Sequence, residues 1–401
     1  MRTPYFLIDE AVIEKNCKVL DRVRKESGCK ILLAQKAYSC FDTYPLIAKY
    51  LDGTTASGLF EARLGKTKFC HCEEGRRSNP DMNEKVCKCN KETHVFAPAF
   101  TDEDMKELVK ICDHIVFNSK AQLLKHHSIC RKHGLQISVR VNPEFKTQEQ
   151  DIYDPCAPLS RFGIRAQDLT DDIVAMVDGL HFHTLCEQGF EPLQKTVAEF
   201  EQKFGKYIKG LKHINFGGGH HITAPDYDVD GLIKLVKEFQ SKYKVQVYLE
   251  PGEAVVLDAG ILVSTVLDIV HNQRDIAILD TSAACHNPDI LETQHDYTPP
   301  ISGAVIASEA SLRGGTTKQS LYRLAGNTCL AGDVIGDYHF ASPLKIGDTI
   351  TFENMALYTM VKTNMFNGIN LPSIYIKRLN GKTELVREFG FEDYISRLGK
   401  K

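Results

Sequence analysis

Eight short apolar runs, each ending abruptly at a polar residue, glycine or proline, constrain the fold of this chain more than any other feature. Amphipathic stretches such as residues 102–111 and 230–243 lie between most of them and have helical spacing. Strands that alternate with helices predict a parallel α/β fold, and eight alternations predict a (β/α)8 barrel. A doubly wound sheet is the rival architecture. The runs are residues 31–34, 54–56, 94–97, 114–117, 137–141, 180–183, 213–216 and 245–249.

Reactive or backbone-permissive residues gather at the ends of these runs. Active sites of such barrels lie at the carboxyl ends of the strands. We therefore expect the functional site among these residues. They are Lys36, Ser57, Pro98, Asn118, Arg140, Asn142, His183, Gly217–Gly219 and Glu250.

After Gly260 the pattern changes to strands without long helices between them. Residues 263–270, 276–279, 349–352 and 373–377 have this character, and glycine and proline mark the turns. This predicts a second, mostly β domain. Residues 4–8 are also strand-like and precede the first helix. We assign residues 10–258 to the barrel, and residues 1–9 with 259–401 to the β domain.

A polar, turn-rich segment, residues 70–90, lengthens one connection of the barrel and reads as a surface insertion. It contains Cys70, Cys72, Cys87 and Cys89. Four thiolates suit tetrahedral zinc, but two Cys-x-Cys pairs chelate less well than Cys-x-x-Cys. A zinc site and an ordinary insertion both stay open here, and we assign no metal site from the sequence.

Composition limits the class of protein and its surroundings. The formal net charge of −3 gives no reason to expect a nucleic-acid partner. No apolar run is long enough to span a membrane, so we expect no membrane partner. Thirteen cysteines, an odd number, with no apolar export signal at the start, predict a reduced, cytoplasmic protein.

Three motifs at the predicted strand ends suggest a cofactor site. Lys36 follows a buried run, where low polarity favours the neutral amine that forms imines, although a lysine extending to solvent is an alternative. Gly217–Gly219 can cradle a phosphate with backbone N–H groups, or can simply form a flexible turn. Glu250 can pair with a protonated ring nitrogen, or can lie in an exposed turn.

Two further motifs carry an imidazole and a thiol. His181 and His183 point the same way on a strand, so one could pack in the core while the other stacks on a flat cofactor. The two histidines could also begin a zinc site, but the sequence has no third ligand at a supporting spacing. Cys329 lies among turn residues, which predicts an accessible thiol able to act as an acid or nucleophile, with a buried small residue as the alternative.

In their order along the chain, these motifs resemble the fold-type III decarboxylases that use pyridoxal phosphate, the alanine racemase/ornithine decarboxylase type. Among these the chain most resembles the carboxynorspermidine/carboxyspermidine decarboxylases. The supporting stretches are residues 3–6, 181–187, 217–223, 250–253 and 328–333. Glu253 stands where relatives acting on ornithine or diaminopimelate carry arginine, and Leu330 stands where they carry an acidic residue.

The resemblance implies a role for each motif. Lys36 would hold pyridoxal 5'-phosphate as an imine, and Cys329 would protonate the α-carbon from the partner subunit of a homodimer. The implied cofactor contacts are Lys36, Arg140, His183, Gly217, Gly218, Gly219, Glu250 and Tyr358. The implied substrate contacts are Glu253, His286, Asp289 and Glu292, and the implied dimer contacts are Arg161 and Asp333.

The expected reaction is decarboxylation of a polyamine-like amino acid, carboxynorspermidine or carboxyspermidine. The nearest alternative is a diaminopimelate or other basic amino-acid decarboxylase, against which Glu253 and Leu330 count. A racemase of this fold would carry arginine in place of Glu250. A non-catalytic regulatory protein is the alternative of another class, and the presence of Lys36, Glu250 and Cys329 together disfavours it.

Overall fold

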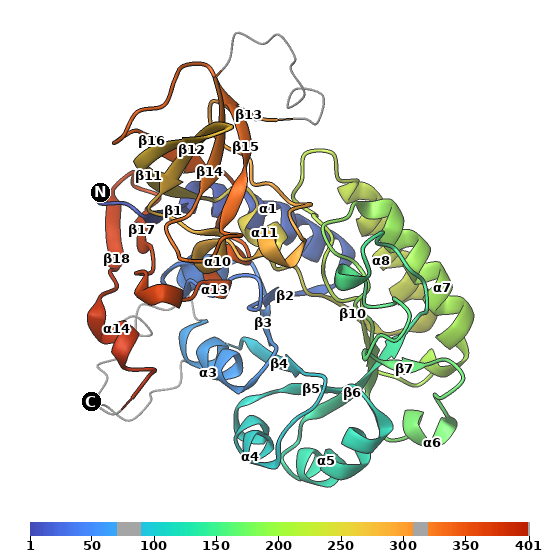
Figure 1. The fold of residues 1–401 in the computed structure, drawn as a ribbon. Coiled ribbons are helices and arrows are strands. Elements are labelled where there is room, and N and C mark those ends of the chain that lie inside the picture. The colour runs from blue at the N-terminus through green and yellow to red at the C-terminus, as the bar shows by residue number, and fades with distance from the viewer. Residues whose placement is uncertain (70–89, 308–319, 400–401) are drawn as a thin grey trace. The chain divides into compact units, whose positions relative to one another are not determined.

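The computed structural model describes residues 1–69, 90–307 and 320–399 (Figure 1). The chain forms two compact units, one from Ile13–Val255 and the other from Met1–Val12 with Val256–Lys401. We call them the barrel and the sheet domain. The four cysteines of the predicted insertion, Cys70, Cys72, Cys87 and Cys89, lie outside the described residues.

Eight parallel strands form the barrel. The ring closes because β2 pairs with β10 and β5 pairs with β6. A two-residue strand, β7 (Ile164–Arg165), pairs with the end of β6. The predicted (β/α)8 barrel is therefore confirmed, and the doubly wound sheet is excluded. The strands are β2 (Lys30–Ala34), β3 (Gly53–Ala56), β4 (Glu92–Phe96), β5 (His114–Phe117), β6 (Gln136–Asn142), β8 (Gly179–His181), β9 (His213–Asn215) and β10 (Gln246–Leu249).

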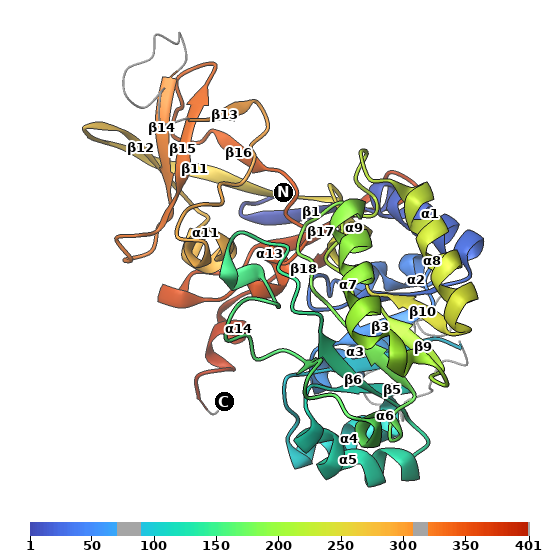
Figure 2. The same ribbon diagram turned by 90° about the vertical axis from the view of Figure 1, so that its right-hand side faces the viewer.

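Three of the barrel helices begin at side chains that cap them. Thr101 caps α4, Ser119 caps α5 and Asp228 caps α8, each accepting a hydrogen bond from a backbone N–H of the first turn. Figure 2 shows α7 and α8 running along the outside of the strands. The helices are α1 (Glu10–Ser27), α2 (Tyr44–Ile47), α3 (Leu59–Lys68), α4 (Asp102–Ile111), α5 (Lys120–Lys132), α6 (Asp171–Val174), α7 (Phe190–Ile208), α8 (Val229–Tyr243) and α9 (Glu253–Val256).

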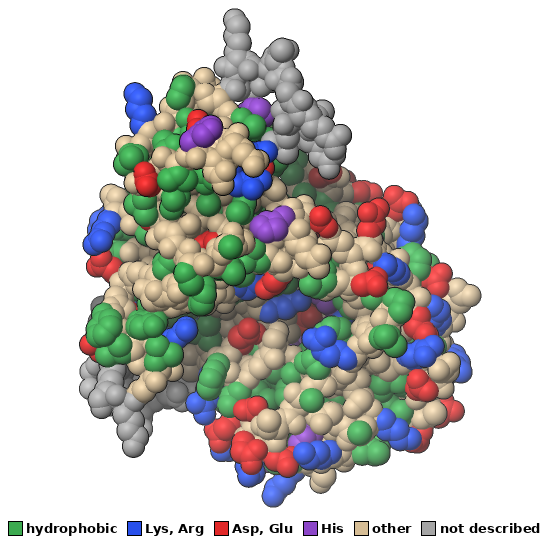
Figure 3. Space-filling model, in the orientation of Figure 1, with side chains coloured by type: hydrophobic (Ala, Val, Ile, Leu, Met, Phe, Trp, Pro, Cys, Tyr) green, Lys and Arg blue, Asp and Glu red, His purple; other side chains and the backbone are tan. Residues whose placement is uncertain are grey.

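Charges of both signs are interspersed on the outer helices of the barrel. Arg63 of α3 pairs with Glu107 of α4, and Lys125 of α5 pairs with Asp102 of α4. Blue and red side chains accordingly alternate over the barrel face seen in Figure 3. Such exposed pairs each contribute less than about 1 kcal/mol, so they keep the surface polar more than they stabilise the fold.

The sheet domain is built around β11 (Gly260–Asn272). This strand pairs with β1 (Tyr5–Asp9), β12 (Arg274–Leu279) and β16 (Thr349–Phe352), so residues from the start of the chain complete the domain. Its core includes Phe6, Leu262, Leu279, Tyr338 and Phe352. The other strands are β13 (Ala304–Ile306), β14 (Ser320–Ala325), β15 (Val334–Phe340), β17 (Ser373–Lys377) and β18 (Thr383–Arg387). The short helices are α10 (Ala283–His286), α11 (Asp289–Glu292), α13 (Thr359–Lys362) and α14 (Phe391–Ile395).

Two general properties of the described residues concern their helices and their cysteines. None of their helices combines the length and the apolar character needed to cross a lipid bilayer. All nine of their cysteines are free thiols.

Candidate active site

Lys36 lies two residues beyond the end of β2, at the carboxyl end of the barrel. Its Nζ is 3.3 Å from Nε2 of His183. Burial, and then the positive charge of Arg140, lower the pKa of Lys36. Both effects favour the neutral amine, which is the nucleophilic form of a lysine.

Hydrogen bonds define the tautomer of His183. The backbone N–H of Gly218 donates to Nδ1 over 2.9 Å, so Nδ1 carries no proton. Burial lowers the pKa of His183 well below its ordinary value, so the ring is neutral and its proton is on Nε2. That proton faces the Lys36 amine, which can accept it only through the lone pair of a neutral nitrogen. The hydrogen-bond geometry and the directions of the two pKa shifts therefore both favour a neutral His183 and a neutral Lys36.

Arg140, on β6, holds the backbone behind His183. Its Nη2 donates to the carbonyl of His183 over 2.8 Å, and its guanidinium lies over the rings of Phe96 and Phe162, at 4.7 and 4.3 Å. Burial lowers the pKa of Arg140 to about 10, which still leaves it charged at neutral pH. A buried cation here destabilises a second positive charge on Lys36.

Glu250, directly after β10, is held as a carboxylate by two partners. Asn215 donates from Nδ2 to Oε1 over 2.8 Å, and Nε2 of His181 lies 3.3 Å from Oε2. Burial opposes ionisation, but His181 and Asn215 outweigh it and lower the pKa of Glu250 to about 2. A buried, ionised carboxylate that pairs with no lysine or arginine side chain among the described residues suits a protonated ring nitrogen.

The three glycines after β9 are needed for close packing. A Cβ on Gly218 would lie 2.0 Å from the carbonyl oxygen of Glu250, and one on Gly219 would lie 1.8 Å from that of Leu185. The N–H of Gly217 donates to Asn215 and that of Gly218 to His183, whereas the N–H of Gly219 has no acceptor among the described residues. Of the three backbone N–H groups, that of Gly219 is therefore the one left to donate to a phosphate. The phosphate contact itself stays a prediction.

Glu253 begins α9, three residues after Glu250. Its side chain is buried, and Oε2 lies 3.6 Å from Nε2 of His221. Its other oxygen, Oε1, is buried with no hydrogen-bond partner among the described residues. A buried carboxylate oxygen without a donor is rare in proteins, so a ligand's N–H is a natural partner for it.

The loop that carries Cys329 is anchored from within the sheet domain. The Cys329 side chain is exposed, and its backbone N–H donates to Oδ1 of Asn367 over 2.7 Å. Asp333 is buried, and its carboxylate accepts from Ser282 Oγ at 2.8 Å and from Thr328 Oγ1 at 2.6 Å. Asp333 thus shapes the cysteine loop of its own chain.

The two predicted dimer residues differ in environment. Arg161 is exposed, and its guanidinium lies 4.4 Å from the centre of the Phe162 ring. The carboxylate of Asp333 is engaged inside its own domain. A contact between them across a dimer stays a prediction.

His286 has no ring nitrogen left for a ligand. Nδ1 accepts from the Ser282 N–H at 3.2 Å, and Nε2 lies 3.0 Å from the carbonyl oxygen of Asn370. Burial lowers the pKa of His286 to about 4, so the ring is neutral. These bonds favour a structural role over the predicted contact with substrate.

Asp289 and Glu292 bind an ammonium group of their own chain. Nζ of Lys362 lies 2.6 Å from Oδ1 of Asp289 and 2.5 Å from Oε2 of Glu292. The same ammonium lies 5.8 Å from the centre of the Tyr358 ring. The predicted substrate carboxylates are therefore near each other, with a lysine between them.

Sequence reasoning missed Asn215. It is paired in register with His181 on β8 and with Tyr248 on β10. The available signal was a polar side chain inside an otherwise apolar run, residues 213–216. A buried amide in such a run needs a partner, and here the partner is Glu250.

Comparison with known proteins gives consistent matches over the chain. The profile of the family described as "Pyridoxal-dependent decarboxylase, C-terminal sheet domain" matches residues 19–356. A carboxynorspermidine/carboxyspermidine decarboxylase of Campylobacter jejuni is 41% identical over 400 residues, covering 99% of this chain and 98% of the relative. A carboxyaminopropylagmatine decarboxylase of Synechocystis is 35% identical, covering 99% and 95%.

Among solved structures, the chain is similar to carboxynorspermidine decarboxylase from Campylobacter jejuni, complexed with norspermidine. The TM-score is 0.87 and the sequence identity is 39%. The alignment covers 99% of this chain and 100% of that chain.

Proposed function

Since this chain belongs to the pyridoxal-dependent decarboxylase family, we propose that it converts carboxynorspermidine and carboxyspermidine into norspermidine and spermidine with loss of carbon dioxide. The neutral Lys36 amine facing His183 carries the chemistry of this proposal. The choice of substrate rests on the full-length similarity to relatives with those names. The reaction would be a step of polyamine synthesis.

The barrel site fits pyridoxal phosphate. Lys36 would hold it covalently, His183 would face its ring, and Glu250 would pair with its ring nitrogen. The N–H of Gly219, with Tyr358, would meet the phosphate. When bound, the cofactor supplies an electron sink for the electron pair left on the α-carbon after carbon dioxide departs.

Cys329 would then deliver a proton to the α-carbon. Its thiol is exposed on an anchored loop, which suits a donor that has to reach a substrate. We assign it to the site of the partner subunit, so the active form would be a homodimer, with Arg161 and Asp333 at the contact.

Acidic side chains would bind the amines of the substrate tail. The carboxylates of Asp289 and Glu292 already bind the ammonium of Lys362, which supports the view that they suit an amine. Glu253 offers a buried oxygen that lacks a donor. A charged hydrogen bond of this kind contributes about 1.5–3 kcal/mol.

A decarboxylation assay tests the choice of substrate. Carbon dioxide release should be fastest with carboxynorspermidine or carboxyspermidine, compared at equal concentration with ornithine, lysine and diaminopimelate. Equal or faster release from any of those three would overturn the substrate assignment. No release from any compound by protein loaded with cofactor would favour the non-catalytic alternative.

The nine described cysteines, all free thiols, also support a cytoplasmic location. Reduced thiols in such number are usual in a reducing compartment. Tracking the tagged protein in cell fractions would test this placement.

A further inference from the structure

The amino end of the barrel contains a polar layer of six residues. The middle of such barrels is usually filled with branched apolar side chains. Here imidazole rings touch across the interior: those of His114 and His213 lie 5.0 Å apart although β5 and β9 are not neighbours. The layer consists of Lys30, Glu92, His94, His114, His213 and Tyr248.

Three members of this layer have their ligand atoms close together. The rings of His94 and His114 are stacked, with centres 3.9 Å apart and planes at 10°, so one ring must turn for both lone pairs to reach one ion. Glu92 and His94 alternate on β4, so they point the same way, and His114 pairs with His94 in register on β5. Oε2 of Glu92 lies 2.9 Å from Nε2 of His94 and 3.9 Å from Nε2 of His114. All three ligand atoms lie within 4.8 Å of one another.

From this geometry we propose that Glu92, His94 and His114 bind a divalent zinc ion at the amino end of the barrel. Zinc bonds of about 2.0–2.1 Å place two tetrahedral ligand atoms about 3.3–3.4 Å apart. The distances from Glu92 Oε2 to Nε2 of His94 and of His114, 2.9 and 3.9 Å, lie on either side of that value. Two imidazoles and one carboxylate form a zinc ligand set, with a fourth position for water. The ion would tie β4 to β5.

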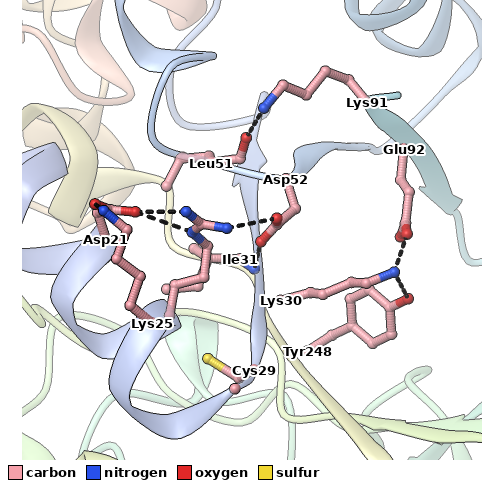
Figure 4. A network of polar contacts seen from close by, with 12 residues as sticks. Asp21, Lys25, Cys29, Lys30, Ile31, Leu51, Asp52, Lys91, Glu92 and Tyr248 are labelled. Carbon is pink, nitrogen blue, oxygen red and sulfur yellow. Dashed lines mark hydrogen bonds and ion pairs between the residues drawn. The ribbon is translucent and has the colours of Figure 1, made fainter. Parts of the chain in front are cut away.

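The ammonium of Lys30 is compatible with this ion. Figure 4 shows Lys30 reaching from β2 to Glu92 and Tyr248. Lys30 contacts Oε1 of Glu92, whereas both histidines face Oε2. The carboxylate therefore offers a separate oxygen to each cation. Removing the ammonium charge of Lys30 should tighten zinc binding, because it relieves repulsion between two nearby positive charges.

A hydrogen-bonded network without metal accounts for only part of the layer. Glu92 bonds to His94, and Ser138 bonds to Nε2 of His213 over 2.7 Å. His114 is buried, and its Nε2 lies 3.9 Å from Oε2 of Glu92, which is too far for a hydrogen bond.

Titration of the pyridoxal-phosphate-loaded protein with cobalt(II), a spectroscopic substitute for zinc, tests the proposal. The experiment uses a Cys72→Ser/Cys87→Ser background, so that neither Cys-x-Cys pair of residues 70–90 binds the ion. We expect one cobalt per chain, tetrahedral visible bands without thiolate charge-transfer absorption, and displacement by zinc. Glu92→Gln and His114→Asn should each weaken binding at least about tenfold, a typical loss for removing one interaction of a metal site.

His213→Gln is the matched control, because it removes a buried imidazole of the same layer whose Nε2 is engaged by Ser138. The His213→Gln variant should bind cobalt as tightly as the background protein. The Lys30→Met variant should bind cobalt more tightly. Circular dichroism identifies any variant that does not fold, and X-ray absorption of the zinc-loaded Cys72→Ser/Cys87→Ser protein reports the ligand set with the proposed site unchanged. Cobalt bands that survive both ligand substitutions, a shell containing sulfur, or no stoichiometric binding would each overturn the proposal.

Discussion

The two ends of the barrel use the same residue types in opposite ways. Lys30 is the first residue of β2, and Lys36 lies two residues past the end of the same strand. At the amino end, Lys30 forms an ion pair with Glu92 and contacts the Tyr248 hydroxyl. At the carboxyl end, Lys36 faces the imidazole of His183. One lysine is paired with a carboxylate, and the other is placed to be neutral.

The difference shows that reactivity depends on the partner and not on the lysine itself. Glu250 is close enough to act on Lys36, but it forms contacts with Asn215 and His181 instead. Arg140 adds a positive charge to that end, which disfavours an ammonium on Lys36. At the amino end Glu92 contacts His94 through one oxygen and still pairs with Lys30 through the other, so we expect charge there and nucleophilic chemistry at the other end.

The largest expected effect separates the two lysines. Lys36→Ala should lose nearly all turnover, because no amine remains to hold the cofactor. Lys30→Met is the control: it changes a lysine of the same strand and should keep most activity. The protein loaded with pyridoxal phosphate should be yellow. Its reduction with borohydride, followed by peptide mapping, should place the cofactor on Lys36. Finding the adduct on Lys30 or on any other lysine would refute the assignment.

The next effect concerns Cys329, which lies in the sheet domain. Cys329→Ala should lower kcat about 10²- to 10⁴-fold, the usual contribution of a positioned proton donor. Mixing it with Lys36→Ala then tests a shared site. Half of the reassorted dimers would be mixed, each with one intact site of two, so about a quarter of the activity should return. If subunit exchange is verified and no activity returns, Cys329 serves its own chain.

The strands of the barrel could be predicted from the sequence because each is short, apolar and bounded by a turn or helix. Residues 114–117 are expected and observed as one strand with the same ends, β5. The strand-end rule then placed Lys36, His183 and Glu250 at one end of the barrel. Local patterns suffice for these features, since parallel strands bring their carboxyl ends to one edge.

Contacts that depend on register or on distant side chains could not be predicted in this way. The pairing of His94 with His114 requires knowledge of how β4 lies against β5. Lys362 reaches Asp289 across 73 positions of sequence, so nothing local indicated that this carboxylate already has a cation. His286 likewise looked available until its bonds to Ser282 and Asn370 were located.

A smaller effect tests how Glu250 is kept ionised. Asn215→Ala removes one bond to the carboxylate, worth about 1.5–3 kcal/mol, so the pKa of Glu250 should rise by about one to two units. In the unmodified protein that pKa is about 2, below the working range. The acidic limb of the kcat profile should therefore move to higher pH, with little change near neutrality. An equal loss of kcat at every pH would indicate a purely structural role for Asn215.

The smallest expected effect is on stability, and it sharpens the contrast between the two ends. The pKa of Lys36 is lowered in the folded, cofactor-free protein, so between that lowered pKa and the ordinary lysine pKa the unfolded chain binds more protons. The free energy of unfolding should therefore rise with pH across that interval, up to the ordinary lysine pKa of about 10.4. Lys36→Met should stabilise the protein at pH 7, and this gain should shrink as the pH approaches 10.

At the amino end of the barrel, Glu92 should affect stability in the opposite direction from Lys36. Burial opposes its ionisation, but His94 and Lys30 outweigh burial and lower its pKa. Its contribution to stability is therefore present above the unfolded pKa of about 4.3 and is lost as the pH falls below it. Glu92→Gln should destabilise the cofactor-free protein at pH 7, measured by urea unfolding with a chelator present to exclude metal. If Lys36→Met and Glu92→Gln shift stability in the same direction, the proposed contrast between a neutral lysine and an ion-paired one is wrong.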